Sequence, residues 1–155
     1  DTALVSIKND TMYIVSYDAN KHQMVYFVFV YSLKSVKIIK TIDDKERMLR
    51  PAGNSFFSSG ALYMPFQDCS KKYGAKIIAR AICATDSDFI FLEQYHVIDK
   101  NIFKGKSVDR IHTINHLSDE TFVVDYMEER FFILKPIKML KRKIRRNKNK
   151  KGKIR

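Results

Sequence analysis

Strand–turn–strand units recur along this chain, and their recurrence limits its fold more than any other feature. Three segments each read as a short strand, a polar turn and a second strand: Leu4–Asp18, Asn54–Asp68 and His112–Tyr126. The first two end in Asp18 and Asp68, which lie fifty positions apart. A period of this size with paired strands is typical of propeller blades rather than of helical solenoids.

Further strands are expected between the hairpins, at Met24–Val30, Val36–Ile42, Ile77–Cys83 and Phe89–Val97. This gives roughly four strands per repeat, which is the composition of a propeller blade. The run Met24–Tyr31 is apolar without interruption and predicts a strand buried on both faces. The sequence therefore predicts an all-β fold. A sandwich of short antiparallel strands would show similar turn spacing and stays open as an alternative.

The basic charge of the chain is confined to one end. The net charge is +12, but residues 135–155 hold twelve Lys and Arg and no acid, which leaves 17 basic against 17 acidic residues elsewhere. The body is neutral, so an electrostatic partner is expected to contact the tail. We therefore divide the chain into residues 1–130, a β-rich body, and 131–155, a basic tail that is helical or disordered.

The tail predicts a membrane-surface segment. From Pro136 a helical register places Ile137, Leu140 and Ile144 on one face, and Lys138, Lys141, Arg142 and Arg145 on the others. A basic helix with an apolar stripe binds anionic lipid through both charge and burial. A solvated extension and a nucleic-acid arm are the alternatives; nucleic acid is disfavoured because it has no use for the apolar stripe.

The residues suited to binding are concentrated between Arg50 and Lys76. Two of three prolines and three of five glycines fall in this stretch, and Gln67-Asp68-Cys69-Ser70 follows the second strand of its hairpin. Polar groups at strand ends beside turns are where binding sites are usually built. Arg50 suits a sugar phosphate or carboxylate through its bidentate fork. The structural alternative pairs Arg50 with Asp68, and Asp68 itself could simply cap the following turn.

Each repeat also begins with a distinctive residue: Asp1, Arg50 and His112. In a propeller the innermost strands line a central channel, so equivalent positions at the blade starts are expected to converge. Two cysteines without a CxxC or a Cys/His cluster predict neither a disulfide framework nor a metal site, and no cofactor is expected.

Several short motifs together resemble a known family. They are Asp1-Thr-Ala-Leu, Met12-Tyr-Ile-Val, Arg50-Pro-Ala-Gly-Asn54, Gln67-Asp-Cys-Ser70 with Tyr73-Gly74, His112-Thr-Ile-Asn115 and Val124-Asp125. In this order they resemble the N-terminal domain of plant glucosamine inositolphosphorylceramide transferases and its bacterial relatives. That domain is similar to the five-bladed propellers of glycoside hydrolases. The resemblance covers Asp1 to about Tyr126.

The resemblance implies the C-terminal blades of a five-bladed propeller, with the other blades upstream of Asp1 or on another chain. It implies a carbohydrate-binding or glycosyl-transfer role in surface-glycan or glycolipid synthesis, at the cytoplasmic face of the membrane. The expected partners are a sugar, glycolipid or sugar phosphate and an anionic membrane. The residues expected to bind the sugar are Asp1, Arg50, Asn54, Gln67, Asp68, Tyr73 and His112.

Whether the chain is catalytic stays open. Glycoside hydrolysis normally needs two facing carboxyl groups. Asp1, Asp68 and Asp125 are available, but no general-acid Glu stands out. An active or relic glycoside hydrolase is therefore the second hypothesis, and a nucleic-acid-binding protein is the third. Cys69 has no adjacent His and is expected to be a buried thiol rather than a nucleophile.

Overall fold

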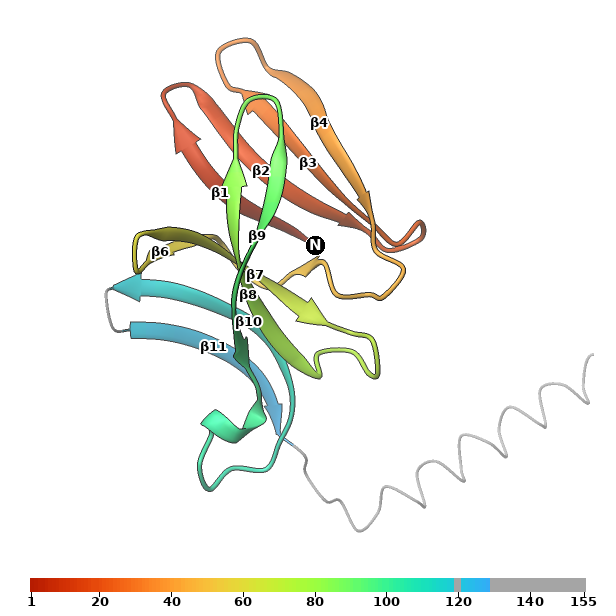
Figure 1. Cartoon of the computed structure of the whole chain (residues 1–155), viewed down its shortest axis with the longest axis vertical. Helices are drawn as coiled ribbons and strands as arrows, with labels where there is room; N and C mark the ends of the chain where they lie inside the picture. Colours follow the sequence, from red (N-terminus) through yellow and green to blue (C-terminus); the bar gives the residue numbers. More distant parts are fainter. Residues whose placement is uncertain (119–120, 129–155) are drawn as a thin grey trace, which may run out of the picture.

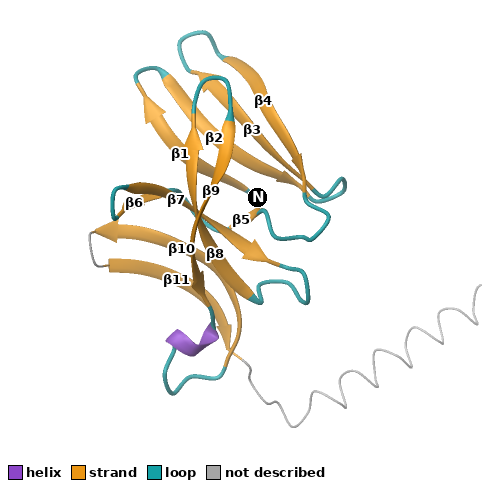
Figure 2. Ribbon diagram, viewed as in Figure 1, coloured by secondary structure: helices purple, strands orange, loops and turns teal. Residues whose placement is uncertain are grey.

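The structure of the chain is a computed structural model that describes residues 1–118 and 121–128. Within these ranges every regular element is a β-strand except one short turn of 3-10 helix, η1 (Lys100–Ile102). The predicted all-β class is therefore confirmed, and Figure 2 shows how completely strands account for the body. The strands form three antiparallel sheets, none of which closes on itself.

Sheet A is a four-stranded meander in the order β1-β2-β3-β4. Its strands are β1 (Thr2–Lys8), β2 (Thr11–Asp18), β3 (Gln23–Val30) and β4 (Ser35–Asp43). They are the red and orange strands of Figure 1. Asn9, in the predicted first turn, has φ 53°, a left-handed conformation that Asn tolerates better than most residues.

Sheet B has the order β5-β7-β8-β9, with β6 also paired to β7. Its strands are β5 (Arg50–Pro51), β6 (Phe56–Ser58), β7 (Ala61–Asp68), β8 (Lys76–Ala84) and β9 (Phe89–Ile98). The first strand of this repeat is split at Gly53, which has φ 141°. A Cβ there would lie 1.9 Å from the carbonyl oxygen of Ile114, so only glycine lets the neighbouring sheet approach this closely.

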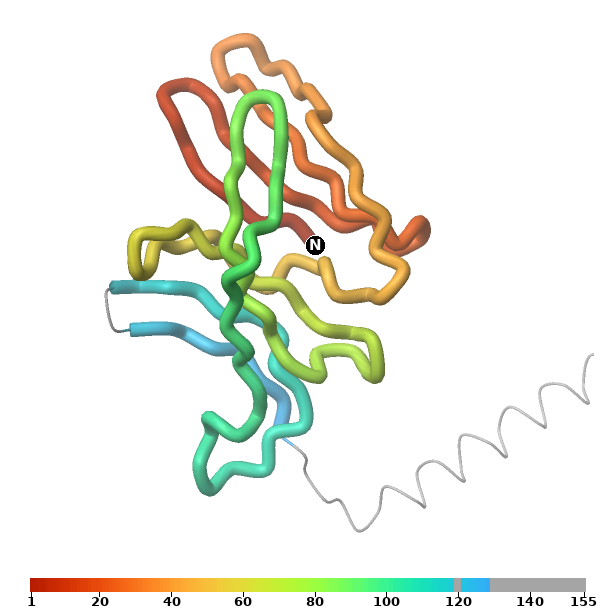
Figure 3. Tube along the Cα trace, in the orientation of Figure 1, coloured from red at the N-terminus to blue at the C-terminus, as the bar shows by residue number. Residues whose placement is uncertain are grey.

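Sheet C is a two-stranded hairpin of β10 (Val108–Ser118) and β11 (Thr121–Glu128). The third predicted hairpin is therefore present and longer than expected at its start, while its turn lies outside the described residues. Figure 3 follows the chain from sheet A through sheet B to sheet C, so chain order matches spatial order. The predicted repeats are thus consecutive, separate sheets.

The three sheets stack through alternating faces of their strands. Tyr13 of β2 lies in the apolar cluster shared with sheet B, and Tyr63, fifty positions later, turns away from sheet A toward sheet C. Phe56 bridges Tyr63 to the ring of Phe122 on β11, with centroids 5.8 and 5.3 Å apart. Phe66 of β7 faces sheet A. Each sheet therefore presents the same face to the next one along the chain.

Backbone and amide hydrogen bonds join the first strands of neighbouring sheets. The Ser55 N–H donates to the Leu4 carbonyl at 3.0 Å, and the Ile114 N–H donates to the Ala52 carbonyl at 2.7 Å. Asn54 takes part at both seams: its Oδ1 accepts from the Leu4 N–H at 3.0 Å, and its own N–H donates to Asn115 Oδ1 at 3.1 Å. These bonds fix the spacing of the strand starts.

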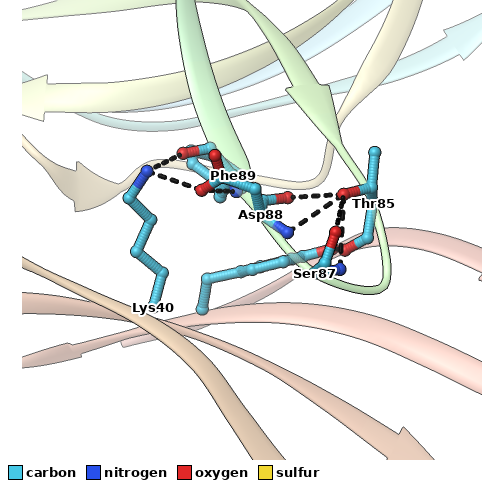
Figure 4. A network of polar contacts seen from close by, with 6 residues as sticks. Lys40, Thr85, Ser87, Asp88 and Phe89 are labelled. Atoms are coloured by element: carbon cyan, nitrogen blue, oxygen red, sulfur yellow. Dashed lines mark hydrogen bonds and ion pairs between the residues drawn. The ribbon is translucent and has the colours of Figure 1, made fainter.

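A second set of polar contacts joins sheet B to the opposite edge of sheet A, at β4 (Figure 4). Lys40 of β4 donates to Asp88 Oδ1 at 2.6 Å and to the Phe89 carbonyl at 3.0 Å. Tyr26, fully buried, donates through its hydroxyl to the Thr85 carbonyl at 2.9 Å. The β8–β9 turn is therefore held against sheet A, and sheet B is joined to both edge strands of sheet A.

The apolar strand β3 is not buried equally on both faces as the sequence predicts. Met24, Tyr26 and Val28 are buried against sheet B, whereas the alternating residues Val25 and Phe27 are only half-buried. With their neighbours in register they form what we call the outer face of sheet A: Met12, Ile14, Val25, Phe27, Phe29, Val36 and Ile38. These residues carry no charge, Asp18 and Asp43 lie at one end of the same face in register with Gln23, and no other described sheet covers it.

We predict that the interface between sheets A and B carries much of the stability. Phe66→Ala removes a side chain that is fully buried there, and it should lower the free energy of unfolding by about 3–5 kcal/mol. Phe57→Ala, at a neighbouring position that is 70% exposed, should change it by less than about 0.5 kcal/mol. Urea unfolding followed by tyrosine fluorescence measures both; equal effects of the two substitutions would contradict the stacked core.

Candidate functional site

Four of the residues predicted to bind a sugar form a continuous row of contacts. Asp1, at the start of β1, forms an ion pair with Nε of Arg50 on β5. The Arg50 guanidinium lies 4.9 Å from the ring centroid of Tyr73 and 6.0 Å from that of Tyr17. The Tyr73 ring meets that of His112 edge to face, with centroids 5.3 Å apart. All three sheets therefore contribute to one row of side chains.

His112 occupies a restricted place at the end of this row. Its Nδ1 lies 3.6 Å from Asp125 Oδ2, while its Nε2 is buried and has no hydrogen-bond partner among the described residues. Gly74, at φ 68°, lies against its ring: a Cβ there would be 2.9 Å from the Ile111 carbonyl oxygen and 3.3 Å from His112 Cδ2. An unpaired buried imidazole nitrogen costs free energy unless a ligand or water reaches it.

Of the other three predicted residues, Asn54 and Gln67 make hydrogen bonds between sheets. Asn54 spans both seams, as described above. Gln67 donates through Nε2 to the His112 carbonyl at 2.8 Å and so joins sheets B and C. Asp68 is only 5% exposed. Contact with a sugar at these three positions stays a prediction, and of the three only Gln67 bonds to a residue of the row, the His112 backbone.

Asp68 does not pair with Arg50, because it caps the turn after β7. Its Oδ1 accepts from the Ser70 N–H at 3.0 Å and from the Ser70 hydroxyl at 2.6 Å, and Lys76 Nζ lies 3.4 Å from Oδ2. Burial alone would raise the pKa of this carboxyl, but the hydrogen bonds from Ser70 and Lys76 outweigh burial and lower it. Asp18, its counterpart fifty positions earlier, caps the β2–β3 turn in the same way.

A cavity of about 160 Å³ opens beside the Arg50 side chain. It is smaller than the 300–1,000 Å³ or so typical of pockets that enclose a whole small-molecule ligand, so it fits one group of a ligand. Three of its wall residues are basic and two are aromatic. The lining consists of Tyr17, Ala19, His22, Arg47, Arg50, Cys69 and Tyr73.

The loop between β4 and β5 builds one wall of this cavity around Asp44. The Asp44 carboxylate is buried and accepts from the N–H of Met48 at 2.7 Å, the N–H of Leu49 at 3.0 Å and the hydroxyl of Tyr17 at 3.0 Å. Burial and then the hydrogen bond to Asp44 raise the pKa of Tyr17 to about 12. Tyr17 therefore stays a neutral donor to Asp44, and its ring is held as a fixed wall.

Cys69 lines the cavity but is not built as a nucleophile. Burial raises the pKa of its thiol, which opposes formation of the thiolate. The Cys69 Sγ lies 3.6 Å from Gln67 Oε1. The expectation of a structural thiol therefore agrees with its surroundings.

The carboxylates are not arranged as a facing pair. Asp1 is paired with Arg50, Asp68 lies under its own turn, and the Asp125 side chain is 65% exposed beyond His112. No Asp or Glu is among the cavity-lining residues. The cavity beside Arg50 thus lacks the two facing carboxyl groups that glycoside hydrolysis normally uses.

The sequence did not single out His22 and Arg47, which line the cavity, or Asp44, which holds the loop between β4 and β5 in place. All three lie in turns of sheet A's repeat, before the motif-rich stretch. The available signal was Asp43-Asp44 directly after a strand, since a carboxylate there commonly binds the N–H groups of the following turn.

In the described ranges, no group of three or more His, Cys, Asp or Glu residues could hold a metal, and no helix could span a membrane. Comparison of the chain with models of protein families, with curated proteins and with solved structures gave no match.

We predict that Asp68 makes stability fall in acid. Because folding lowers its pKa below the ordinary value of 3.8, its contribution is complete above that pH and is lost as the pH falls through the lowered value. Thermal melts of the wild type between pH 7 and pH 3 should therefore decline more steeply than those of Asp68→Asn. Comparing the two proteins at each pH cancels the titration of the other carboxylates. Parallel curves would contradict the prediction.

Proposed function

We propose that this chain is a carbohydrate-binding part of a β-propeller that serves surface-glycan or glycolipid synthesis. The observation that carries the proposal is the row Asp1–Arg50–Tyr73–His112, in which residues of three successive sheets meet beside a basic, aromatic cavity. Convergence of strand starts on one site is the geometry of ligand binding in a propeller channel.

The arrangement of the sheets supports a propeller over a sandwich. Three consecutive sheets stack in chain order and in one sense, whereas a sandwich packs two sheets face to face. The outer face of sheet A corresponds in register to the face of sheet B that packs on sheet A. A further blade would cover it, and we propose five blades in the complete ring.

The walls of the cavity suit a sugar that carries an acidic group. The ring faces of Tyr17 and Tyr73 offer apolar surfaces for the C–H groups of a sugar, and Arg50 supplies donors that bind phosphate or carboxylate. This site positions a sugar without supplying a pair of catalytic carboxyl groups, which favours binding or assistance in transfer over hydrolysis.

We predict that Arg50→Ala lowers the affinity for phosphorylated or carboxylated oligosaccharides by about tenfold or more, because a charge-assisted hydrogen bond contributes roughly 1.5–3 kcal/mol. The fold should persist, since Arg50 forms part of a cavity wall rather than of the core. A glycan array followed by titration calorimetry measures the binding, and thermal melts check folding.

Arg80→Ala is the matched control for Arg50. Arg80 also lies over an aromatic ring, with its guanidinium 5.3 Å from the centroid of Phe91, but it is not among the residues that line this cavity. Arg80→Ala should therefore leave the affinity for these oligosaccharides unchanged. Loss of folding in Arg50→Ala, with no ligand found for the wild type, would reduce Arg50 to a structural role.

The basic tail lies outside the described residues, and its membrane role stays a proposal. If the predicted apolar stripe enters the interface, Ile137→Ser with Leu140→Ser should strongly reduce sedimentation with anionic vesicles, because burial contributes about 25 cal/mol per Å² beside the charge. Association with RNA, which needs only the charge, should not change. Asn147→Ser with Asn149→Ser is the control. Vesicle binding that survives loss of the stripe would leave only a polycationic tail.

A further inference from the structure

Arg47 lies in the β4–β5 loop in a backbone conformation that its side chain does not favour. Its φ is 58°, in the left-handed region that costs a residue with a Cβ free energy relative to glycine. The loop enforces this conformation, since the Arg47 N–H donates to the Asp44 carbonyl at 3.1 Å and its own carbonyl accepts from the Cys69 N–H at 2.8 Å. Strain of this kind at a cavity wall points to a function for the side chain.

The two arginines of the cavity differ in how far their charges are already satisfied. Arg50 is paired with Asp1 and lies against the rings of Tyr17 and Tyr73. The Arg47 guanidinium forms no ion pair and no hydrogen bond with any residue in the described ranges. The Asp44 carboxylate beneath the loop is buried and already accepts from three donors. Arg47 is therefore the arginine of this cavity whose charge is not already paired within the described part of the chain.

We propose that Arg47 joins Arg50 in holding an oxyanion group of the ligand, a phosphate or a carboxylate, while Tyr73 forms the wall against which the rest of the ligand lies. The inference rests on the proposed sugar-binding function and names the group that the site reads. A guanidinium offers paired N–H donors matched to two oxygens of such a group. The small size of the cavity agrees with the capture of one acidic group.

The strain allows a test that separates function from stability. Arg47→Gly places at φ 58° the residue that adopts it without cost, so its melting temperature should be equal to or higher than that of the wild type. Its affinity for acidic oligosaccharides should nevertheless fall by about tenfold, the loss expected for a charge-assisted hydrogen bond. Lys34→Gly, at φ 48° in the β3–β4 turn, is the control and should bind as the wild type does.

Chemical modification with phenylglyoxal gives a second measurement, which needs no sugar ligand. Inorganic phosphate should slow modification of Arg47 in the wild type and leave Arg80 and Arg110 unaffected, as read by peptide mass spectrometry. Unchanged modification of Arg47, or wild-type binding by Arg47→Gly, would overturn the inference. If Arg50→Ala loses binding and Arg47→Gly retains it, the sugar site stands and only the role of Arg47 fails. If phosphate protects Arg47 but no acidic sugar binds, the sugar-binding function fails and the oxyanion site stands.

Discussion

Packing of sheet B between two neighbours is the constraint on which the rest of this structure depends. Every second residue of β7 faces sheet A and the residues between them face sheet C, so neither contact can shift without disturbing the other. This double burial fixes where the loops at the strand ends lie. The Asp44 loop and the Asp68 turn meet around one cavity, and His112 of β10 packs against Tyr73 in its wall, because the three sheets are held in register beneath them.

Local pattern predicted the strands, because each is a run of β-branched and aromatic residues bounded by turn residues. Two features depended on contacts between sheets and could not be predicted from the local sequence. The run in β3 is buried on one side only, since burial depends on which sheet lies opposite. The first strand of sheet B is interrupted at Gly53, because the carbonyl oxygen of Ile114, sixty-one positions later, leaves no room there for a Cβ.

The grouping of the candidate site residues could likewise be predicted only in part. Asp1, Arg50, Tyr73 and His112 could be chosen because they stand at strand starts and beside a turn glycine, and the structure places them in contact. Arg47 could not be chosen, because nothing in Lys45-Glu46-Arg47 distinguishes it from other exposed charged residues. The backbone conformation of Arg47 comes from a turn whose shape is set by Asp44 and by the N–H of Cys69, the residue that follows β7 of sheet B.

The common sense of stacking has a consequence for assembly. Each seam joins two unlike faces, so the contact is heterologous, and a stack built this way has two different ends. One end here is the largely apolar outer face of sheet A; at the other, Asp125 and Thr113 of sheet C lie among exposed Val123 and Met127. Heterologous contacts either close into a ring or continue indefinitely. The rotation between neighbouring sheets, rather than the chemistry of any one sheet, therefore decides between a discrete particle and a filament.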